Sequence, residues 1–372
     1  MSRPPDPTAP RPPSPLGFDP FAPLRPLVEG VGGVDQADRV RRGMLVHQAV
    51  PRPPVGLTPH TVIHAQNKLV VRYYPPTGAV RKTPVVVVPS MINRAYICDL
   101  EPDRSLVGGL ARAGHPTYLV DWGVPGEEDA KTSVADVVLD LLHRAVDRVC
   151  RHAKSPTASL LGYCQGGTLA TIYAALRPRR VATLAVFNAP VRFSAGGRFR
   201  DFVDPAAFDV DEAIDKERLL PIELMRVAFK LLDPMGNWNK YIAIEQDAHD
   251  PQRLARTMAR ERWLEENVPM PGTFAAEFIR NAYQEDRLLA GTWEIGGERV
   301  DLRQITVPLL VLAAAKDFIT PAESALPLAE ATGSADVTSE VLASGHIGVV
   351  VGGFGPKVFY PLLSRWHQAR TP

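Results

Sequence analysis

The sequence has few cysteines and no excess of charge of either sign. Its three cysteines, Cys98, Cys150 and Cys164, are a sparse and odd-numbered set, which argues against a disulfide framework and favours a reducing, cytoplasmic compartment. There are 42 lysines and arginines and 41 acidic residues, a formal net charge of +1, so we expect no nucleic-acid partner. No apolar run approaches the about 18 residues that a transmembrane helix needs, and residues 1–15 lack the apolar core of a signal peptide.

Proline, by contrast, is plentiful. The chain has 36 prolines among 372 residues, about twice the usual share, and many of them fall before residue 57. This composition predicts a largely disordered leader over residues 1–57, although the spacing of apolar residues over 35–50 is compatible with one short helix. The remaining length suits one large α/β domain.

From residue 61 onward, short β-rich runs replace the prolines. Two runs flank a tight turn at Gln66 and Asn67 and predict a hairpin. Six nearly continuous apolar runs follow, at residues 84–89, 116–122, 158–163, 181–188, 308–315 and 337–343. Such runs suit strands that are buried on both faces of a parallel sheet, and helical patterns at 103–113 and 133–149 fit crossover helices. The sequence therefore predicts a mostly parallel central sheet covered by helices.

The rhythm of strands stops between residues 193 and 306, where helical patterning and aromatic residues dominate. An insertion at this place in an α/β sheet is typical of a cap over an active site, and a helical layer without a gating role is the alternative. We therefore expect a core formed by residues 58–192 and 307–372, with a helical cap at 193–306.

The motif GYCQGG, residues 162–167, lies between an apolar run and a helix-like segment. Strand, sharp turn and helix form the context of a G-x-S-x-G nucleophile elbow, with sulfur here in place of oxygen. The glycines allow close packing around a strained residue, and the start of the following helix favours a thiolate. Cys164 is therefore the candidate nucleophile, whereas Cys98 and Cys150 lack such an elbow and are interpreted as inert core residues.

Two further residues complete a catalytic triad in the order that the α/β-hydrolase fold requires. Asp317 follows the run at 308–315, and His346 follows the run at 337–343. In this fold the nucleophile, the acid and the histidine come in that sequence order, each after a strand. Asp121 also follows a strand, but it precedes the nucleophile, so Asp317 is the preferred acid.

An oxyanion hole needs two backbone N–H donors. The first is expected from Gln165, directly after the nucleophile, and the second from the loop after residues 84–89, at Met91 or Ile92. No motif indicates a metal ion or a bound cofactor, and no residues that bind CoA can be identified.

A cysteine at the elbow suits acyl transfer between thioesters. Attack of a thiolate on a thioester exchanges one thioester for another at little free-energy cost, so the acyl group stays activated. His346 would accept the thiol proton and later assist a hydroxyl acceptor, while Asp317 orients the imidazole. A more direct action of Asp317 on the hydroxyl is an alternative.

The chain resembles the poly(3-hydroxyalkanoate) synthases, particularly the short class III type. The similarity covers about residues 58 to 366 and includes the phrases VVPSMINRAYICDL, TYLVDWGVP, GYCQGGTL, KYIAIEQD, ERWLEENVP, GGERVDLRQITVPLL, KDFITPAES and GHIG. The family's catalytic cysteine, aspartate and histidine fall on Cys164, Asp317 and His346.

The resemblance implies a polymerase that converts (R)-3-hydroxyacyl-CoA into polyester, with release of CoA, at the surface of intracellular granules. It also implies a second, non-catalytic subunit, and the aromatic-rich insertion could supply a homodimer surface. Two features depart from the family: Phe318 stands where a histidine often follows the aspartate, and the leader is unusual. These departures leave the acyl chain length and the subunit requirement open.

Two other functions compete with polymerisation. A thioesterase or esterase would hydrolyse the same acyl-enzyme, which the fold permits. A catalytically silent granule-binding protein is a third hypothesis, against which the intact Cys, Asp and His set argues.

Overall fold

A computed structural model describes residues 34–214 and 218–371 of the chain. These described residues form two compact units, one within residues 52–234 and 255–371 and the other within residues 34–51 and 235–254. Most of the predicted leader lies outside the described residues. None of the described helices is long and apolar enough to cross a membrane.

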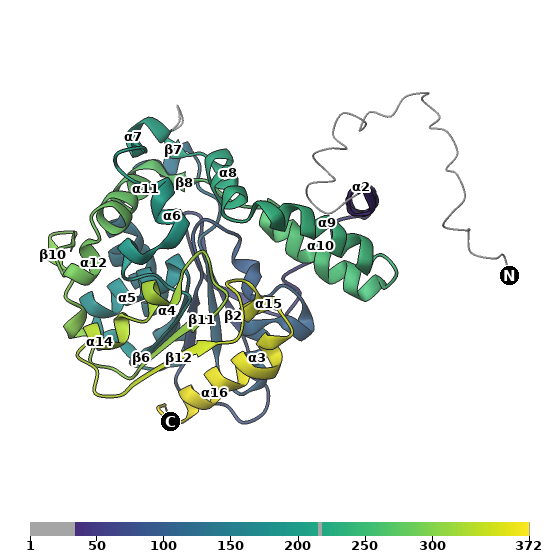
Figure 1. The fold of residues 1–372 in the computed structure, drawn as a ribbon. Helices are drawn as coiled ribbons and strands as arrows, with labels where there is room; N and C mark the ends of the chain where they lie inside the picture. Colours follow the sequence, from purple (N-terminus) through teal and green to yellow (C-terminus); the bar gives the residue numbers. More distant parts are fainter. Residues whose placement is uncertain (1–33, 215–217, 372) are drawn as a thin grey trace, which may run out of the picture. The chain divides into compact units, whose positions relative to one another are not determined.

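The larger unit is built on an eight-stranded sheet, which Figure 1 shows in its centre. In spatial order the strands are β1 (Thr61–Gln66), β2 (Leu69–Tyr74), β4 (Thr117–Asp121), β3 (Val85–Val88), β5 (Ala158–Tyr163), β6 (Val181–Phe187), β11 (Leu309–Ala314) and β12 (Val337–Leu342). The pairs β1 with β2 and β2 with β4 are antiparallel, and all other neighbours are parallel. The predicted hairpin and the six predicted runs thus form one mostly parallel sheet, and the predicted fold class is confirmed.

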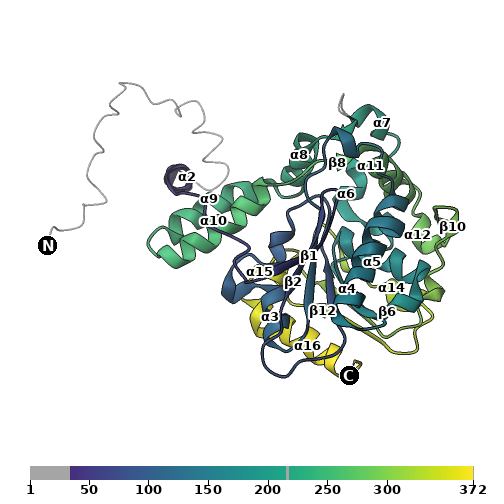
Figure 2. The ribbon, with the colours of Figure 1, turned by 180° about the vertical axis from the view of Figure 1, so that it is seen from behind.

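The strands form where they do because both faces of the sheet are covered. All four valines of β3 and all six residues of β5 are buried, as continuous β-branched and apolar runs require. One face packs against the π-helical segment Asp136–Leu142, α4 (His143–Ala153) and α5 (Gln165–Leu176). The other packs against α3 (Leu106–Arg112), α15 (Gly348–Val351) and α16 (Tyr360–Gln368), as Figures 1 and 2 show from opposite sides.

Short helices and very short strands fill the region between β6 and β11. In the larger unit they are α6 (Gly197–Phe202), α7 (Val210–Ala213), β7 (Leu219–Leu220), α8 (Ile222–Leu232), β8 (Met270–Pro271), α11 (Gly272–Phe278), α12 (Arg287–Ala290), β9 (Glu294–Ile295) and β10 (Glu298–Arg299). Two more short helices, α13 (Ala322–Ala325) and α14 (Leu328–Ala331), lie between β11 and β12. Strands β7 and β8 pair antiparallel, with Leu220 opposite Met270.

The smaller unit contains α2 (Val34–Ala49) and most of α9 (Pro234–Asp247), together with the start of α10 (Pro251–Glu265). Helix α2 is the helix that the apolar spacing predicted within the leader. Arg39 and Arg42 on α2 both pair with Glu245 on α9. A Cβ atom at Gly43 would lie 1.9 Å from the carbonyl oxygen of Tyr241, so the two helices approach too closely for any larger residue there.

Candidate active site

Cys164 stands at the sharp turn between β5 and α5. Its backbone has φ +54° and ψ −133°, a conformation that costs a non-glycine residue free energy and that clusters at functional sites. The carbonyl oxygen of Cys164 accepts hydrogen bonds from the amides of Gly167 and Thr168 at 2.8 and 3.3 Å. Its side chain is partly exposed, so the thiol can be reached.

The three glycines of the elbow are required by close backbone contacts. A Cβ atom at Gly162 would lie 2.4 Å from the Cα of Gly167. A Cβ atom at Gly166 would lie 2.2 Å from the carbonyl oxygen of Val88, and one at Gly167 would lie 2.4 Å from the Cβ of Ala189. The motif therefore packs strand and helix together more closely than any side chain allows.

His346 and Asp317 lie on loops that follow β12 and β11, and they contact each other. Nδ1 of His346 is 2.6 Å from Oδ2 of Asp317. Oδ1 of Asp317 accepts the backbone amides of Ile319 and Thr320 at 2.9 and 2.8 Å. Both side chains are buried, so the carboxylate is held rigidly and aimed at the imidazole.

The charges around His346 favour its protonated form. Burial lowers the pKa of His346, but the negative charges of Cys164 and Asp317 and hydrogen bonds to both outweigh burial and raise this pKa to about 10. The structure thus brings the three predicted residues into one interacting group, in which the protonated imidazole of His346 is favoured beside Cys164 and Asp317. Their catalytic roles stay a prediction.

The competing acid, Asp121, lies elsewhere. Its carboxylate pairs with Arg72 of the neighbouring strand β2 and accepts the amide of Gly123 at 3.1 Å. The end of β4 is thereby fixed to β2, and Asp121 has a structural partner rather than a histidine.

The two parts of the predicted oxyanion hole are joined by the side chain of Gln165. Its Oε1 accepts the backbone amide of Met91 at 3.0 Å and the hydroxyl of Ser90 at 3.4 Å. The Met91 amide is therefore already engaged. The amide of Gln165 itself is at the first position of α5, where no intrahelical acceptor exists.

Two residues that the sequence did not single out hold the loop that carries His346. The carbonyl oxygen of His346 accepts hydrogen bonds from the hydroxyl of Tyr163 at 3.1 Å and from Nδ2 of Asn188 at 3.0 Å. Asn188 has φ +48°, a left-handed conformation that asparagine tolerates better than most residues. Its place at the end of the run at 181–188 was the available signal.

One aromatic side chain from the region after β6, that of Tyr283, interacts electrostatically with Cys164 and belongs to a cluster of rings. The ring of Phe193 lies 4.7 Å from that of Tyr283 and 5.9 Å from that of Phe278, centroid to centroid. Burial raises the pKa of Tyr283, and the negative charge of Cys164 raises it further, so this phenol is within electrostatic reach of the thiol. Tyr283 thus connects this aromatic cluster to the vicinity of Cys164.

The other two cysteines are buried, and they differ from Cys164 in their electrostatic environment. Cys98 ends a 3₁₀ turn (Ala95–Cys98) and Cys150 lies in α4. Burial raises the pKa of both thiols, as the interpretation of inert core residues requires. Within residues 34–214 and 218–371, no group of three or more histidine, cysteine or acidic side chains is placed to hold a metal ion.

Comparison with known protein families shows which proteins this chain is related to. A model of the alpha/beta hydrolase fold matches residues 83–352, and a model of the poly-beta-hydroxybutyrate polymerase (PhaC) N-terminus matches residues 53–109. The poly(3-hydroxyalkanoate) polymerase subunit PhaC of Allochromatium vinosum is 31% identical over 320 residues, which cover 85% of this chain and 90% of that protein. This chain belongs to the PhaC family.

Other PhaC relatives are about as similar. The Synechocystis protein is 31% identical over 324 residues, covering 85% of this chain and 86% of its own length. The Haloferax mediterranei protein is 31% identical over 327 residues, covering 87% of this chain and 66% of its own length.

Solved structures show the fold alone. A monoacylglycerol lipase of Paleococcus ferrophilus has a TM-score of 0.50 at 16% identity, covering 82% of this chain and 100% of that one. A protein of Mycobacterium tuberculosis has a TM-score of 0.53 at 17% identity, covering 82% and 94%.

Proposed function

We propose that this member of the PhaC family polymerises (R)-3-hydroxyacyl-CoA into polyester and releases CoA, with the growing chain held as a thioester on Cys164. The observation that carries the proposal is the interacting group of Cys164, His346 and Asp317 at an α/β-hydrolase elbow. Family membership supports the reaction class. The chemistry of the site supports the assignment of individual residues.

Acylation begins with the thiolate of Cys164. It attacks the thioester carbonyl, and the carbonyl oxygen becomes an oxyanion that the amides of Gln165 and Ile92 would stabilise. We assign the second donor to Ile92 because the amide of Met91 is engaged by Gln165. Collapse of the intermediate breaks the bond to CoA, whose sulfur takes the proton from His346 and departs as the free thiol.

Chain extension needs a base and an activated ester. His346, neutral after CoA leaves, would accept the proton of the 3-hydroxyl of an incoming 3-hydroxyacyl-CoA as its oxygen attacks the thioester carbonyl on Cys164. The ester bond forms as the bond to the sulfur of Cys164 breaks, and the released thiolate then attacks the CoA thioester of the extended chain as in acylation. Asp317 would stabilise the imidazolium that forms. Both oxygens of Asp317 are already engaged, by His346 and by the amides of Ile319 and Thr320, which supports the orienting role over direct action on the hydroxyl.

Water has to be kept from the acyl-enzyme if transfer is to outrun hydrolysis. Tyr283, which interacts electrostatically with Cys164 and packs against the rings of Phe193 and Phe278, supports a role of this region in that task. We therefore propose that the part of the predicted cap that belongs to the larger unit, within residues 193–234 and 255–306, covers the thioester.

The proposal includes a cellular setting. We propose that the chain works in the cytoplasm at the surface of polyester granules, as one of two subunits or as a homodimer. The word subunit in the relatives' names supports a partner. Light scattering of the purified chain, alone and after co-expression with a small non-catalytic subunit, tests this part.

The activity is tested with purified protein and 3-hydroxybutyryl-CoA. We expect release of CoA, accumulation of insoluble polymer and an acyl adduct on Cys164 that mass spectrometry detects. Cys164→Ala should abolish all three while Cys150→Ala keeps them. Equal amounts of CoA and free hydroxy acid, without polymer, would instead identify a thioesterase, and an unmodified Cys164 would indicate a silent protein.

A further inference from the structure

The end of α10 and the residues that follow it run alongside the loop between β3 and α3. Four polar contacts join the two segments directly: Trp263 Nε1 to the carbonyl oxygen of Arg94 at 2.8 Å, Tyr96 to Glu266 at 2.9 Å, Asn93 to Asn267, and the amide of Val268 to the carbonyl oxygen of Ile92 at 3.1 Å. A fifth link runs from Met270 through the side chain of Gln165 to Met91. Trp263, Asn267 and Met270 are buried. The loop that carries Met91 and Ile92 is therefore fastened along its length to residues 263–270.

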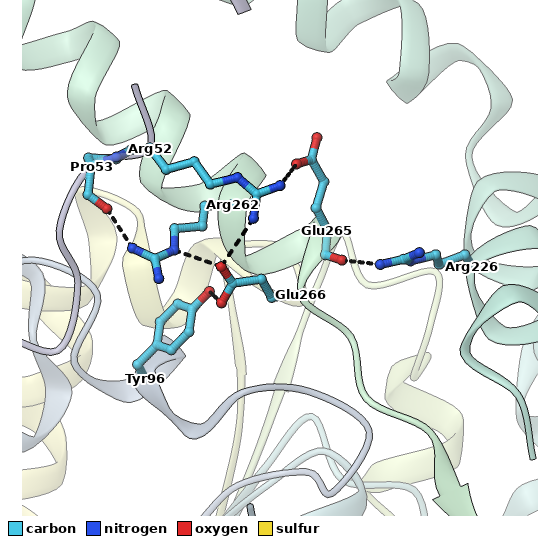
Figure 3. A network of polar contacts seen from close by, with 7 residues as sticks. All are labelled: Arg52, Pro53, Tyr96, Arg226, Arg262, Glu265 and Glu266. Atoms are coloured by element: carbon cyan, nitrogen blue, oxygen red, sulfur yellow. Dashed lines mark hydrogen bonds and ion pairs between the residues drawn. The ribbon is translucent and has the colours of Figure 1, made fainter. Parts of the chain in front are cut away.

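The outer part of this contact is anchored by charge, as Figure 3 shows. Glu266 accepts hydrogen bonds from Tyr96, Arg262 and Arg52. The carbonyl oxygen of Glu265 accepts a hydrogen bond from Arg226 on α8. Residues 265 and 266 are thus held from several directions, which leaves residues 267–270 little freedom.

Gln165 closes the inner end of the contact. Its Oε1 accepts the Met91 amide at 3.0 Å, and its Nε2 contacts Sδ of Met270 at 3.7 Å. The side chain is buried, so loss of either polar partner would leave an unpaired group inside the protein. The residue that follows the nucleophile thereby connects the elbow, the loop and the region after β6.

We propose that Gln165 is a positioning residue for the oxyanion hole. Its side-chain carboxamide accepts a hydrogen bond from the Met91 amide and contacts Met270, and it thereby fixes the loop that carries the Ile92 amide. The inference rests on the proposed function. An oxyanion donor is useful only when it is held in place before the reaction, because a mobile donor must be reorganised at the transition state. The backbone amide of Gln165 donates to the oxyanion, and its side chain fixes the second donor.

Gln165→Met tests the role, because methionine keeps the size of the side chain and the backbone amide but removes the acceptor for Met91. Two reactions of Cys164 are compared. Acylation by 3-hydroxybutyryl-CoA, followed as the first turnover of CoA release, builds an oxyanion. Alkylation by iodoacetamide uses the same thiolate but forms no oxyanion. We expect the acylation rate to fall about tenfold or more, with KM little changed and the alkylation rate within twofold of the parent.

Asn267→Ala removes the hydrogen-bond partner of Asn93, farther along the same loop. It should also lower the acylation rate, but by less than Gln165→Met does. Gln66→Met makes the matched change at a half-buried glutamine on β1, where the side chain donates to Asp140, and should change neither reaction. Circular dichroism and the melting temperature establish that each variant is folded.

Two results would overturn the inference. An equal fall of the acylation and alkylation rates in Gln165→Met would mean that the substitution displaces the thiol itself. An unchanged acylation rate would mean that the contact with Met91 does not contribute to the reaction. A parent protein that is alkylated but never acylated contradicts the proposed function, and this role with it.

Discussion

Nδ1 of His346 lies 2.6 Å from Oδ2 of Asp317, whose side chain is fully covered. A carboxylate in this position fixes the tautomer of the imidazole and stabilises its protonated form. Asp317→Asn keeps the shape but presents either an uncharged oxygen or an N–H to Nδ1. We expect kcat for CoA release to fall by about 10² to 10⁴, with a smaller change in KM.

Asp121→Asn is the matched control, since Asp121 is the other aspartate that follows a strand. It should leave kcat within a few-fold of the parent and lower the melting temperature, because Asp121 pairs with Arg72. The reverse pattern, with Asp121→Asn inactive and Asp317→Asn active, would show that Asp121 and not Asp317 is the acid of the triad.

The raised pKa of His346 predicts the reactivity of Cys164. This pKa is about 10, so the positively charged imidazolium persists through neutral pH next to Cys164. His346→Gln removes that cation, and we expect iodoacetamide to alkylate Cys164 about tenfold or more slowly at pH 7. Near pH 10 the two rates should converge, because the parent then loses its imidazolium.

The rates are followed by mass spectrometry of the peptide that contains Cys164. The peptides of Cys98 and Cys150 serve as internal controls, because burial raises the pKa of both thiols. Equal rates for the parent and His346→Gln at pH 7 would contradict an influence of the imidazolium on Cys164.

The backbone contact at Gly166 predicts a stability effect. Gly166→Ala would place a Cβ atom 2.2 Å from the carbonyl oxygen of Val88, so strand and helix must separate. We expect a loss of at least about 2 kcal/mol in the free energy of unfolding, measured by urea denaturation. Gly353→Ala, where nothing lies within 4 Å of the added atom, should cost far less.

Much of the core and the triad could be predicted because they depend on local pattern. Strands buried on both faces need continuous apolar runs, and an elbow needs small residues around a reactive one. The sequence order of nucleophile, acid and histidine then singled out Asp317 and His346. Each of these signals depends on residues that are close together in the sequence.

The contacts around the triad could not be predicted in this way. The bond from Asn188 to the His346 carbonyl joins residues 158 positions apart, and the bond from Asn93 to Asn267 joins residues 174 apart. Residues so far apart in the chain form no recognisable pattern in the sequence. The engagement of the Met91 amide by Gln165 has the same origin, and it shifts the expected second donor from Met91 toward Ile92.

A buried pair of histidines predicts how stability depends on pH. His115 and His367 are both fully buried, with ring centroids 6.0 Å apart. Burial, the largest cause in each case, and nearby positive charge lower the pKa of His115 to about 4 and that of His367 to about 3. The folded protein therefore keeps both rings neutral where an unfolded chain would protonate them.

The direction in which the free energy of unfolding changes with pH follows from the number of protons that each state binds. Below the unfolded pKa of about 6.5 the unfolded chain takes up protons that the folded chain refuses, so the free energy of unfolding decreases as pH falls from 6.5 toward 4. Each histidine contributes up to about 1.4 kcal/mol per pH unit, and the contribution is fully present above pH 6.5. His346 adds little over most of this window, because its raised pKa keeps it protonated in the folded chain and its ordinary pKa leaves it protonated in the unfolded chain well below pH 6.5.

His367→Gln isolates the effect, because glutamine remains neutral at every pH. The variant should be less stable than the parent at pH 7, where it loses the contact of His367 with Thr183, but its stability should fall less steeply between pH 6.5 and 5. Urea denaturation at several pH values gives both quantities, with the exposed His249→Gln as control. If the slope of the variant equals that of the parent, the protonation of His367 does not limit stability in acid.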